Sequence, residues 1–136
     1  MSDIDQVMAA AATGLRAQTT RMRIAAENVA NANSTGVNPN EEPFRRRIPL
    51  METTTLASGA LGVRVTGATQ DMSTFREEYN PSHPAADSDG YVRLPNVDTL
   101  VEMMDLREAT RAYEANLNMI EAARTMTARA LDLLRR

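Results

Sequence analysis

Apolar side chains recur at alternating steps of four and three residues over the first part of the chain. Their positions, interrupted only by Gln18, are Ile4, Met8, Ala11, Leu15, Gln18, Met22, Ala25 and Val29. This spacing keeps one face of an α-helix turned towards a partner. The pattern therefore predicts a helix over about residues 4–32. Asn33 or Gly36, which tolerate a positive φ, would end it.

A second helical pattern occupies the C-terminal part of the chain. The helix is expected to open at Pro95, Asn96 and Asp98, and Thr99, followed three residues later by Glu102, fits a capping box. Two neighbouring stripes follow: the first contains Leu106, Thr110, Tyr113, Leu117, Ile120, Arg124, Thr127, Leu131 and Leu134, and the second contains Ala109, Ala112, Asn116, Met119, Ala123, Met126, Ala130 and Leu133. Two stripes predict more than one packing partner, because a single neighbouring helix covers only one of them.

Both predicted helices are long for so small a chain. At about 1.5 Å per residue they extend on the order of 40 Å and 55 Å. Two interpretations of the stripes stay open, namely a helical hairpin within one chain and packing against the helices of other subunits. The shortage of other core-forming sequence favours assembly.

The middle of the chain, residues 36–96, is rich in Pro, Gly, Thr and Asn. Short alternating stretches run through Phe44, Arg46, Ile48 and Leu50, and again through Leu61, Val63 and Val65. They predict short strands that form a hairpin. Pro81, Pro84 and Pro95 predict an extended connector rather than a helix before the second helical pattern.

These patterns predict a mainly α fold with a small β region. Residues 1–35 form an N-terminal helix, residues 36–96 a β-rich or extended middle segment, and residues 97–136 a C-terminal helix. The two terminal helices pack together in a coiled-coil-like domain. The short hairpin and the extended loop lie between them in the sequence.

Composition excludes several classes of function. The chain has 136 residues, which is the size of one modest domain. Its 18 acidic and 15 basic residues give a net charge of -3, so there is no electrostatic case for nucleic acid or an anionic membrane. No apolar run approaches the roughly 20 residues of a membrane span, and the start lacks the positive charge of a secretory signal.

Candidate chemistry is scarce. Cys and Lys are absent, which excludes thiol nucleophiles, cysteine-bound metals and lysine-dependent phosphate loops. His83 is the single histidine, and the prolines on either side of it indicate a turn residue. The segment 87–90 resembles a calcium loop, but Ala85 and Asn96 stand where two of the ligands belong. We therefore predict no catalytic, cofactor or metal site, and a hydrolase built around His83 is the enzyme alternative.

The basic run Arg45, Arg46 and Arg47 does not predict a phosphate-binding face, because alternate side chains of a strand point to opposite sides. We expect these arginines to be solvated or to pair with neighbouring acids.

Sequence motifs at both ends resemble a known family. NVANANSTG at residues 28–36, preceded by LRAQTTRM at 15–22, is similar to the amino-terminal signature of the flagellar rod and hook axial proteins. EMMDLREATRAYEANLNMI at residues 102–120 resembles their carboxy-terminal signature. Between them, residues 79–97 resemble a block of the proximal rod members.

The resemblance implies a structural subunit that assembles through its terminal helices into the hollow shaft that transmits motor torque. It implies packing between subunits at the signature residues Asn28, Asn31, Asn33, Gly36, Met104, Arg111, Tyr113, Glu114, Asn116, Leu117 and Ile120. It also implies residence in the periplasmic rod of the basal body after type III export without cleavage of a signal peptide.

The partners that the resemblance implies are the rod proteins FlgB, FlgF and FlgG, the FliE junction protein, other copies of the chain and the type III export apparatus. Neither nucleic acid nor direct membrane insertion is implied. A coiled-coil adaptor or an export chaperone of a type III secretion system is the alternative, since such a protein would share the apolar stripes.

Overall fold

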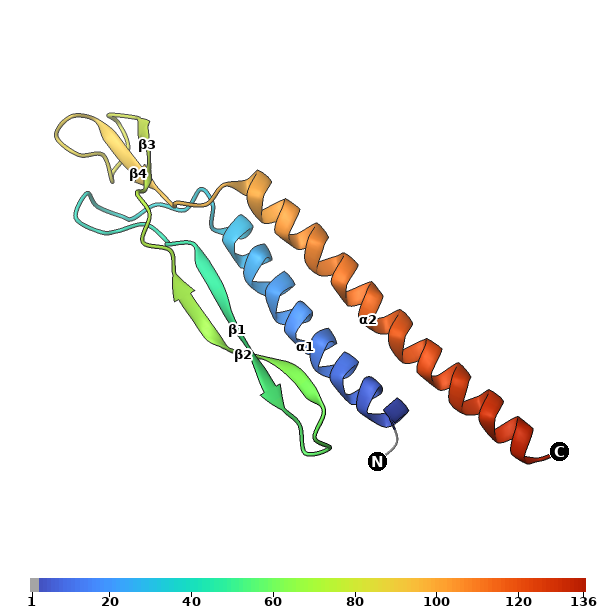
Figure 1. Ribbon diagram of the computed structural model, residues 1–136. Helices are drawn as coiled ribbons and strands as arrows, with labels where there is room; N and C mark the ends of the chain where they lie inside the picture. Colours follow the sequence, from blue (N-terminus) through green and yellow to red (C-terminus); the bar gives the residue numbers. More distant parts are fainter. Residues whose placement is uncertain (1–2) are drawn as a thin grey trace.

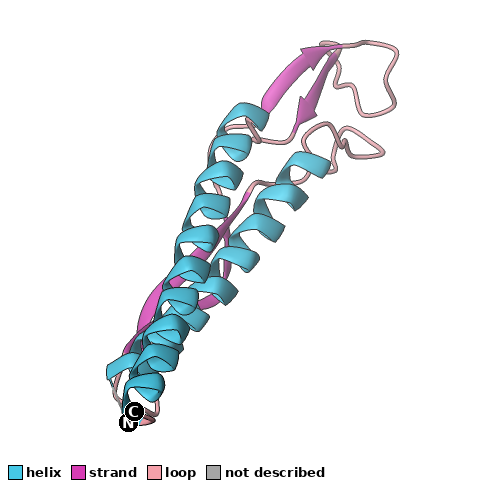
Figure 2. Ribbon diagram, turned by 90° about the vertical axis from the view of Figure 1, so that its right-hand side faces the viewer, coloured by secondary structure: helices cyan, strands magenta, loops and turns pink. Residues whose placement is uncertain are grey.

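The computed structural model describes residues 3–136, so residues 1–2 of the predicted N-terminal segment lie outside it. The elements in chain order are α1 (Asp3–Ala30), β1 (Arg47–Thr55), β2 (Leu61–Gln70), β3 (Arg76–Tyr79), β4 (Tyr91–Leu94) and α2 (Thr99–Leu134). The molecule is elongated, and α1 lies between α2 on one side and the β1–β2 hairpin on the other (Figure 1). The start of α1 and the end of α2 lie at one end, and β3–β4 lies at the opposite end (Figure 2). The predicted fold class is confirmed.

The end of α1 differs from the prediction. The helix stops at Ala30, and neither Asn33 nor Gly36 adopts a left-handed conformation, because positive φ values within residues 3–136 occur only at Gly59, Gly67 and Gly90. The chain leaves the helix through tight turns instead, in which the Asn31 side chain donates to the Glu27 carbonyl at 2.9 Å. The predicted left-handed cap is therefore wrong.

The start of α2 uses a different cap from the predicted one. Asp98 is the N-cap, and its carboxylate accepts a hydrogen bond from the backbone N–H of Leu100 at 3.0 Å. Glu102 does not turn back to the helix start, because its side chain is buried among polar partners from α1 and from the segment before β1. The Thr99–Glu102 capping box is thus also wrong.

The predicted hairpin is present as the antiparallel pair β1–β2. A bulge between Leu50 and Met51 shifts the register, and Gly67, at φ 155°, lies opposite Leu50. The hairpin is joined to α1 by the Thr13 hydroxyl, which accepts a hydrogen bond from the Val63 N–H at 3.0 Å. The proline-containing connector has no helix, as predicted, but it also contains a second, short antiparallel pair, β3–β4.

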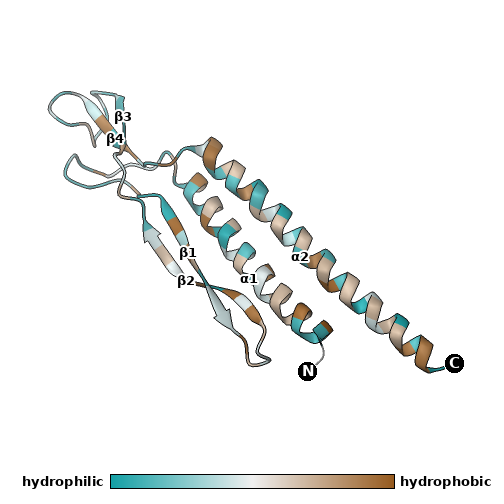
Figure 3. Ribbon diagram, viewed as in Figure 1, coloured by the Kyte–Doolittle hydropathy of each residue, from teal (hydrophilic) through white to brown (hydrophobic). Residues whose placement is uncertain are grey.

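The core consists of small side chains. Within residues 3–136 the buried apolar side chains are Ala11, Ala17, Ile24, Ala25, Ala32, Ala85, Val92, Val97, Ala109 and Ala123. Seven of these ten are alanines, which bury little area each and let backbones approach closely. Many large apolar side chains are exposed instead, including several at both ends of α2 (Figure 3).

Candidate subunit-packing surface

A buried polar cluster joins the end of α1, the start of β1 and the start of α2. The Asn28 amide bonds to both backbone groups of Arg47, since its Nδ2 donates to the carbonyl at 2.9 Å and its Oδ1 accepts from the N–H at 3.0 Å. Nδ2 also donates to Glu102 Oε2 at 3.2 Å. Asn28 thus pairs with the strand as a neighbouring strand would, while it holds the second helix.

Arg46 supplies the positive charge of this cluster. Its Nε donates to Glu102, and its terminal nitrogens lie 3.3 Å from Asp105 Oδ2 and 3.5 Å from Asp71 Oδ2. Burial by itself lowers the pKa of Arg46, but the hydrogen bond and charge of Glu102 and the charges of the two aspartates outweigh it and raise the pKa above its ordinary value. The guanidinium stays charged and neutralises the buried carboxylate.

Asp71 is held by the chain that follows it. Hydrogen bonds from the backbone and side chain of Ser73, with a smaller contribution from Arg46, keep the pKa of Asp71 below its usual range. Asn96 completes the arrangement, because its amide donates to the Asp71 carbonyl at 2.8 Å and accepts from the Arg46 N–H at 2.8 Å. The cluster therefore also fixes the segment between the two hairpins.

Small residues let α1 and α2 approach each other along their length. Gly14 of α1 lies against Asn116 of α2, and a Cβ added at Gly14 would come within 2.6 Å of the Asn116 amide nitrogen. The Thr110 hydroxyl of α2, which donates to the Leu106 carbonyl at 2.8 Å, lies 3.5 Å from the sulfur of Met22. The pair forms one packed unit within a single chain.

Replacing Gly14 with Ala is expected to destabilise the folded chain by a net of about 0–2 kcal/mol, because overpacking against the Asn116 amide costs about 1–3 kcal/mol while the helix propensity of Ala returns about 1 kcal/mol. The double change Gly14→Ala with Asn116→Ala removes the clash and keeps the helix-propensity advantage of Ala, which is about 1 kcal/mol. Thermal denaturation in a stabilising osmolyte measures both effects. A higher Tm for Gly14→Ala alone would contradict this packing.

The structure places the predicted N-terminal signature residues in different environments. Asn28 is buried in the polar cluster, and Asn31 is half-buried against its own helix end. Asn33 is exposed. Gly36 is buried where a Cβ would come within 2.7 Å of the Glu41 carbonyl, so its small size, rather than a positive φ, explains the glycine. Asn28 and Gly36 thus act within the chain's own fold.

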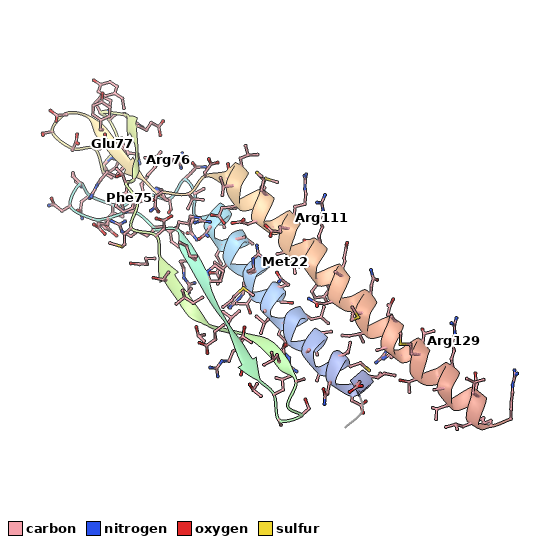
Figure 4. All side chains as sticks on the ribbon, viewed as in Figure 1. Met22, Phe75, Arg76, Glu77, Arg111 and Arg129 are labelled. Carbon is pink, nitrogen blue, oxygen red and sulfur yellow. The ribbon has the colours of Figure 1, made fainter. Side chains whose placement is uncertain are left out.

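The C-terminal signature divides between two faces of α2. Tyr113, Asn116 and Ile120 are half-buried, and Asn116 contacts α1. The exposed signature residues are Met104, Arg111, Glu114 and Leu117. Figure 4 shows Arg111 pointing away from α1, whereas Met22 of α1 lies on the side of α2. Asn116 thus belongs to the contact between the two helices, whereas the side chains of the second group are exposed in the single chain.

The sequence patterns did not show which apolar residues of α2 stay exposed, and we call the exposed ones the outer apolar residues. They are Leu100, Val101, Met103, Met104, Leu117, Met119, Met126, Leu131, Leu133 and Leu134. Those near the C-terminus lie on the part of α2 that extends past the start of α1 (Figure 1). The two predicted stripes contain six of the ten, but their burial could not be assigned without the position of α1.

Both ring nitrogens of His83 lie near polar groups of neighbouring loops. Its Nδ1 accepts a hydrogen bond from the Ala85 N–H at 3.0 Å, and its Nε2 lies 3.4 Å from the Thr35 hydroxyl. The described part of the chain brings no three His, Cys, Asp or Glu side chains together in an arrangement suited to a metal ion. Over the same residues, neither helix is at once long and apolar enough to cross a membrane.

Comparison with known proteins finds similarity to proteins of the flagellar basal-body rod. The family profile described as flagellar basal body rod FlgEFG protein, C-terminal, matches residues 88–133. The flagellar basal-body rod protein FlgC of Agrobacterium fabrum is 44% identical over 126 residues, covering 92% of this chain and 91% of that protein. FlgC of Bacillus subtilis is 35% identical, over 90% of this chain and 92% of the relative. FlgC of Salmonella typhimurium is 33% identical, over 90% and 92% respectively.

Proposed function

The chain belongs to the FlgC family of flagellar basal-body rod proteins, and we propose on this premise that it builds the proximal part of a hollow shaft by packing its terminal helices against neighbouring subunits. It is a structural component of the rod. Its role is to transmit torque mechanically, without catalysing a reaction. The rod name of the relatives favours this function over a coiled-coil adaptor or an export chaperone.

The distribution of apolar side chains carries the proposal. The buried apolar side chains are mostly alanines, whereas large ones such as Met104, Leu133 and Leu134 are at least 60% exposed. A monomer that kept this surface in water would lose the stabilisation that burial of these side chains provides. Neighbouring subunits that cover the outer apolar residues would supply it.

The remaining features of the proposal follow from this role. The chain reaches the periplasmic rod by type III export and keeps its N-terminus. Its partners are other copies of itself, the rod proteins FlgB, FlgF and FlgG, and the FliE junction protein. We propose that residues 1–35 and 97–136 form the axial part of the subunit and that residues 36–96 lie farther from the axis.

Substitution of outer apolar residues tests the proposal in motile cells that carry the variant as their single copy. Leu117→Asp and Met104→Asp are each expected to abolish swimming and rod assembly, because a charge placed in an apolar subunit contact costs several kcal/mol, on the order of a lost buried ion pair. Secretion of the subunit should persist.

Gln70→Glu is the control for the added charge. Gln70 is exposed at the end of β2, in the segment proposed to lie farther from the axis, so the new charge should leave swimming intact. Normal swimming of both the Leu117 and Met104 variants would overturn the proposal that these residues meet other subunits.

A further inference from the structure

Methionine is distributed unevenly between the inside and the surface of the folded chain. Within residues 3–136, none of the buried apolar side chains is a methionine. Met8 and Met22, both on α1, are half-buried. The other methionines of the described chain are exposed, namely Met51, Met72, Met103, Met104, Met119 and Met126. Four of these six lie on α2, so this helix presents its thioethers to solvent.

The four exposed methionines of α2, which we call the α2 methionines, belong to the outer apolar residues. Met103 and Met104 lie in the first turns of the helix and are 61% and 64% exposed. Met119 and Met126 are seven residues apart and therefore lie on one side of the helix. Both line a groove of about 200 Å³ between the start of α1 and the end of α2, together with Asp3, Ile4, Val7, Ala122 and Ala123. Apart from Asp3, every residue that lines this groove is apolar.

An exposed thioether is open to a two-electron oxidation. A peroxide such as hydrogen peroxide transfers one oxygen atom to the sulfur: the S–O bond forms from a sulfur lone pair while the O–O bond breaks. The sulfur is oxidised to methionine sulfoxide, and the peroxide is reduced to water. The product is a polar, chiral side chain in place of a flexible apolar one. Burial of its oxygen without a hydrogen-bond donor is unfavourable.

We propose that the α2 methionines form an oxidation-sensitive site that controls whether the subunit can assemble, an inference that deepens the rod function proposed above and rests on it. Oxidation of the unassembled chain by a peroxide stops α2 from packing against neighbouring subunits. The fold of the single chain stays intact. Methionine sulfoxide reductases restore the thioethers and with them the capacity to assemble. In the rod, neighbouring subunits cover the α2 methionines and protect them.

The composition of the core explains why oxidation acts on assembly and not on folding. The buried apolar side chains are alanines with Ile24, Val92 and Val97, which a peroxide does not oxidise. The buried polar cluster around Glu102 contains no sulfur either. Met22 has the internal position, because its sulfur lies 3.5 Å from the Thr110 hydroxyl of α2, and its partial burial should slow its oxidation.

Oxidation rates test the accessibility of the site in the full-length chain. The chain is treated with hydrogen peroxide in a stabilising osmolyte, and mass spectrometry of its peptides measures the sulfoxide at each methionine. The α2 methionines should be oxidised several-fold faster than Met22. In isolated basal bodies their rates should fall towards that of Met22. Equal rates in the folded chain, or no protection in basal bodies, would overturn the proposal.

Helix formation with partner subunits measures the consequence of oxidation. Addition of the partner rod subunits proposed above should raise the helix content of the untreated chain. After peroxide treatment most of this gain should be lost, because each buried sulfoxide weakens the contact on the order of tenfold. Methionine sulfoxide reductases A and B should restore the gain. The helix formed in osmolyte alone should be the same before and after peroxide, and its loss would show that oxidation acts on folding instead.

Leucine substitutions locate the sensitivity on α2. Leucine is close to methionine in volume and has no sulfur. A chain with leucine at all four α2 methionines should respond to partner subunits equally before and after peroxide. Met51→Leu with Met72→Leu is the matched control and should remain as sensitive as the wild type. A response of the four-leucine chain that is still lost on oxidation would overturn the proposal, and so would a failure of the reductases to restore the wild-type response.

The outcome is distinguishable from failure of the proposed function. If the untreated wild type gains no helix with partner subunits, packing between subunits is itself contradicted. If the untreated and the oxidised wild type gain helix equally, the packing stands and the oxidation-sensitive site is removed.

Discussion

The purified chain in dilute solution is expected to show far less helix than the 28 residues of α1 and 36 residues of α2 in the folded subunit. Helices gain most of their stability from packing, and here the buried apolar side chains are mainly alanines. Far-ultraviolet circular dichroism measures the helix content. It should rise when partner rod subunits are added, because they cover the outer apolar residues, and when an excluded osmolyte is added, because it favours the compact folded chain.

A Leu133→Asp variant provides the control for this experiment. Leu133 is 71% exposed in the single chain, so its replacement should leave the response to osmolyte unchanged while it reduces the response to partner subunits. A fully helical, sharply melting monomer would contradict the expectation, since the chain would then stabilise both helices without neighbours.

Replacing Arg46 with Met is expected to have the largest effect on the stability of the folded subunit, about 3–5 kcal/mol, because it leaves a buried carboxylate without its counter-charge. The Glu102 side chain is 2% exposed, and the Arg46 side chain beside it is 21% exposed. Urea denaturation in a stabilising osmolyte measures the loss, and rod assembly in cells should fall with it.

Arg47→Met is the matched control, because the same chemical change is made one residue away. Its partner is Glu27 at 2.9 Å, and both side chains are more than one third exposed, so the expected loss is about 0–1 kcal/mol. Adding Glu102→Met to Arg46→Met should recover much of the stability, since both charges are then removed. Equal losses of stability for Arg46→Met and Arg47→Met would show that the buried polar cluster does not hold the two helices and β1 together.

The sequence patterns predicted the elements well where periodicity was strong. The alternation of four and three steps from Ile4 to Val29 corresponds to α1, and the alternating stretches around Ile48 and Val63 correspond to β1 and β2. The four-residue strands β3 and β4 were missed, because the loop of prolines between them hides so short an alternation. The capping box was placed one residue too late, since Asp98 and Thr99 are adjacent and both are good N-cap residues.

The polar cluster could not be predicted from local pattern, because its members are far apart in the chain. Asn28 and Arg46 were singled out for other reasons, and Glu102 was assigned to a cap. One signal was present in the sequence: Glu102 stands four residues before Leu106, in line with the apolar stripe, so an acid occupies a position that faces the partner helix. The run Arg45, Arg46 and Arg47 contains the cation that pairs with this acid.

Pairing of the two chain ends also determines when the subunit can fold. Asn28 and Glu102 are 74 residues apart in the sequence. The helices α1 and α2 can therefore pack together only after the intervening segment, residues 31–98, has folded back on itself. Contacts of such long sequence separation slow folding, because the entropy of loop closure is lost before any contact compensates for it. The contacts that join the two helices therefore form only after both ends of the chain are present, which is compatible with the end-first export proposed above.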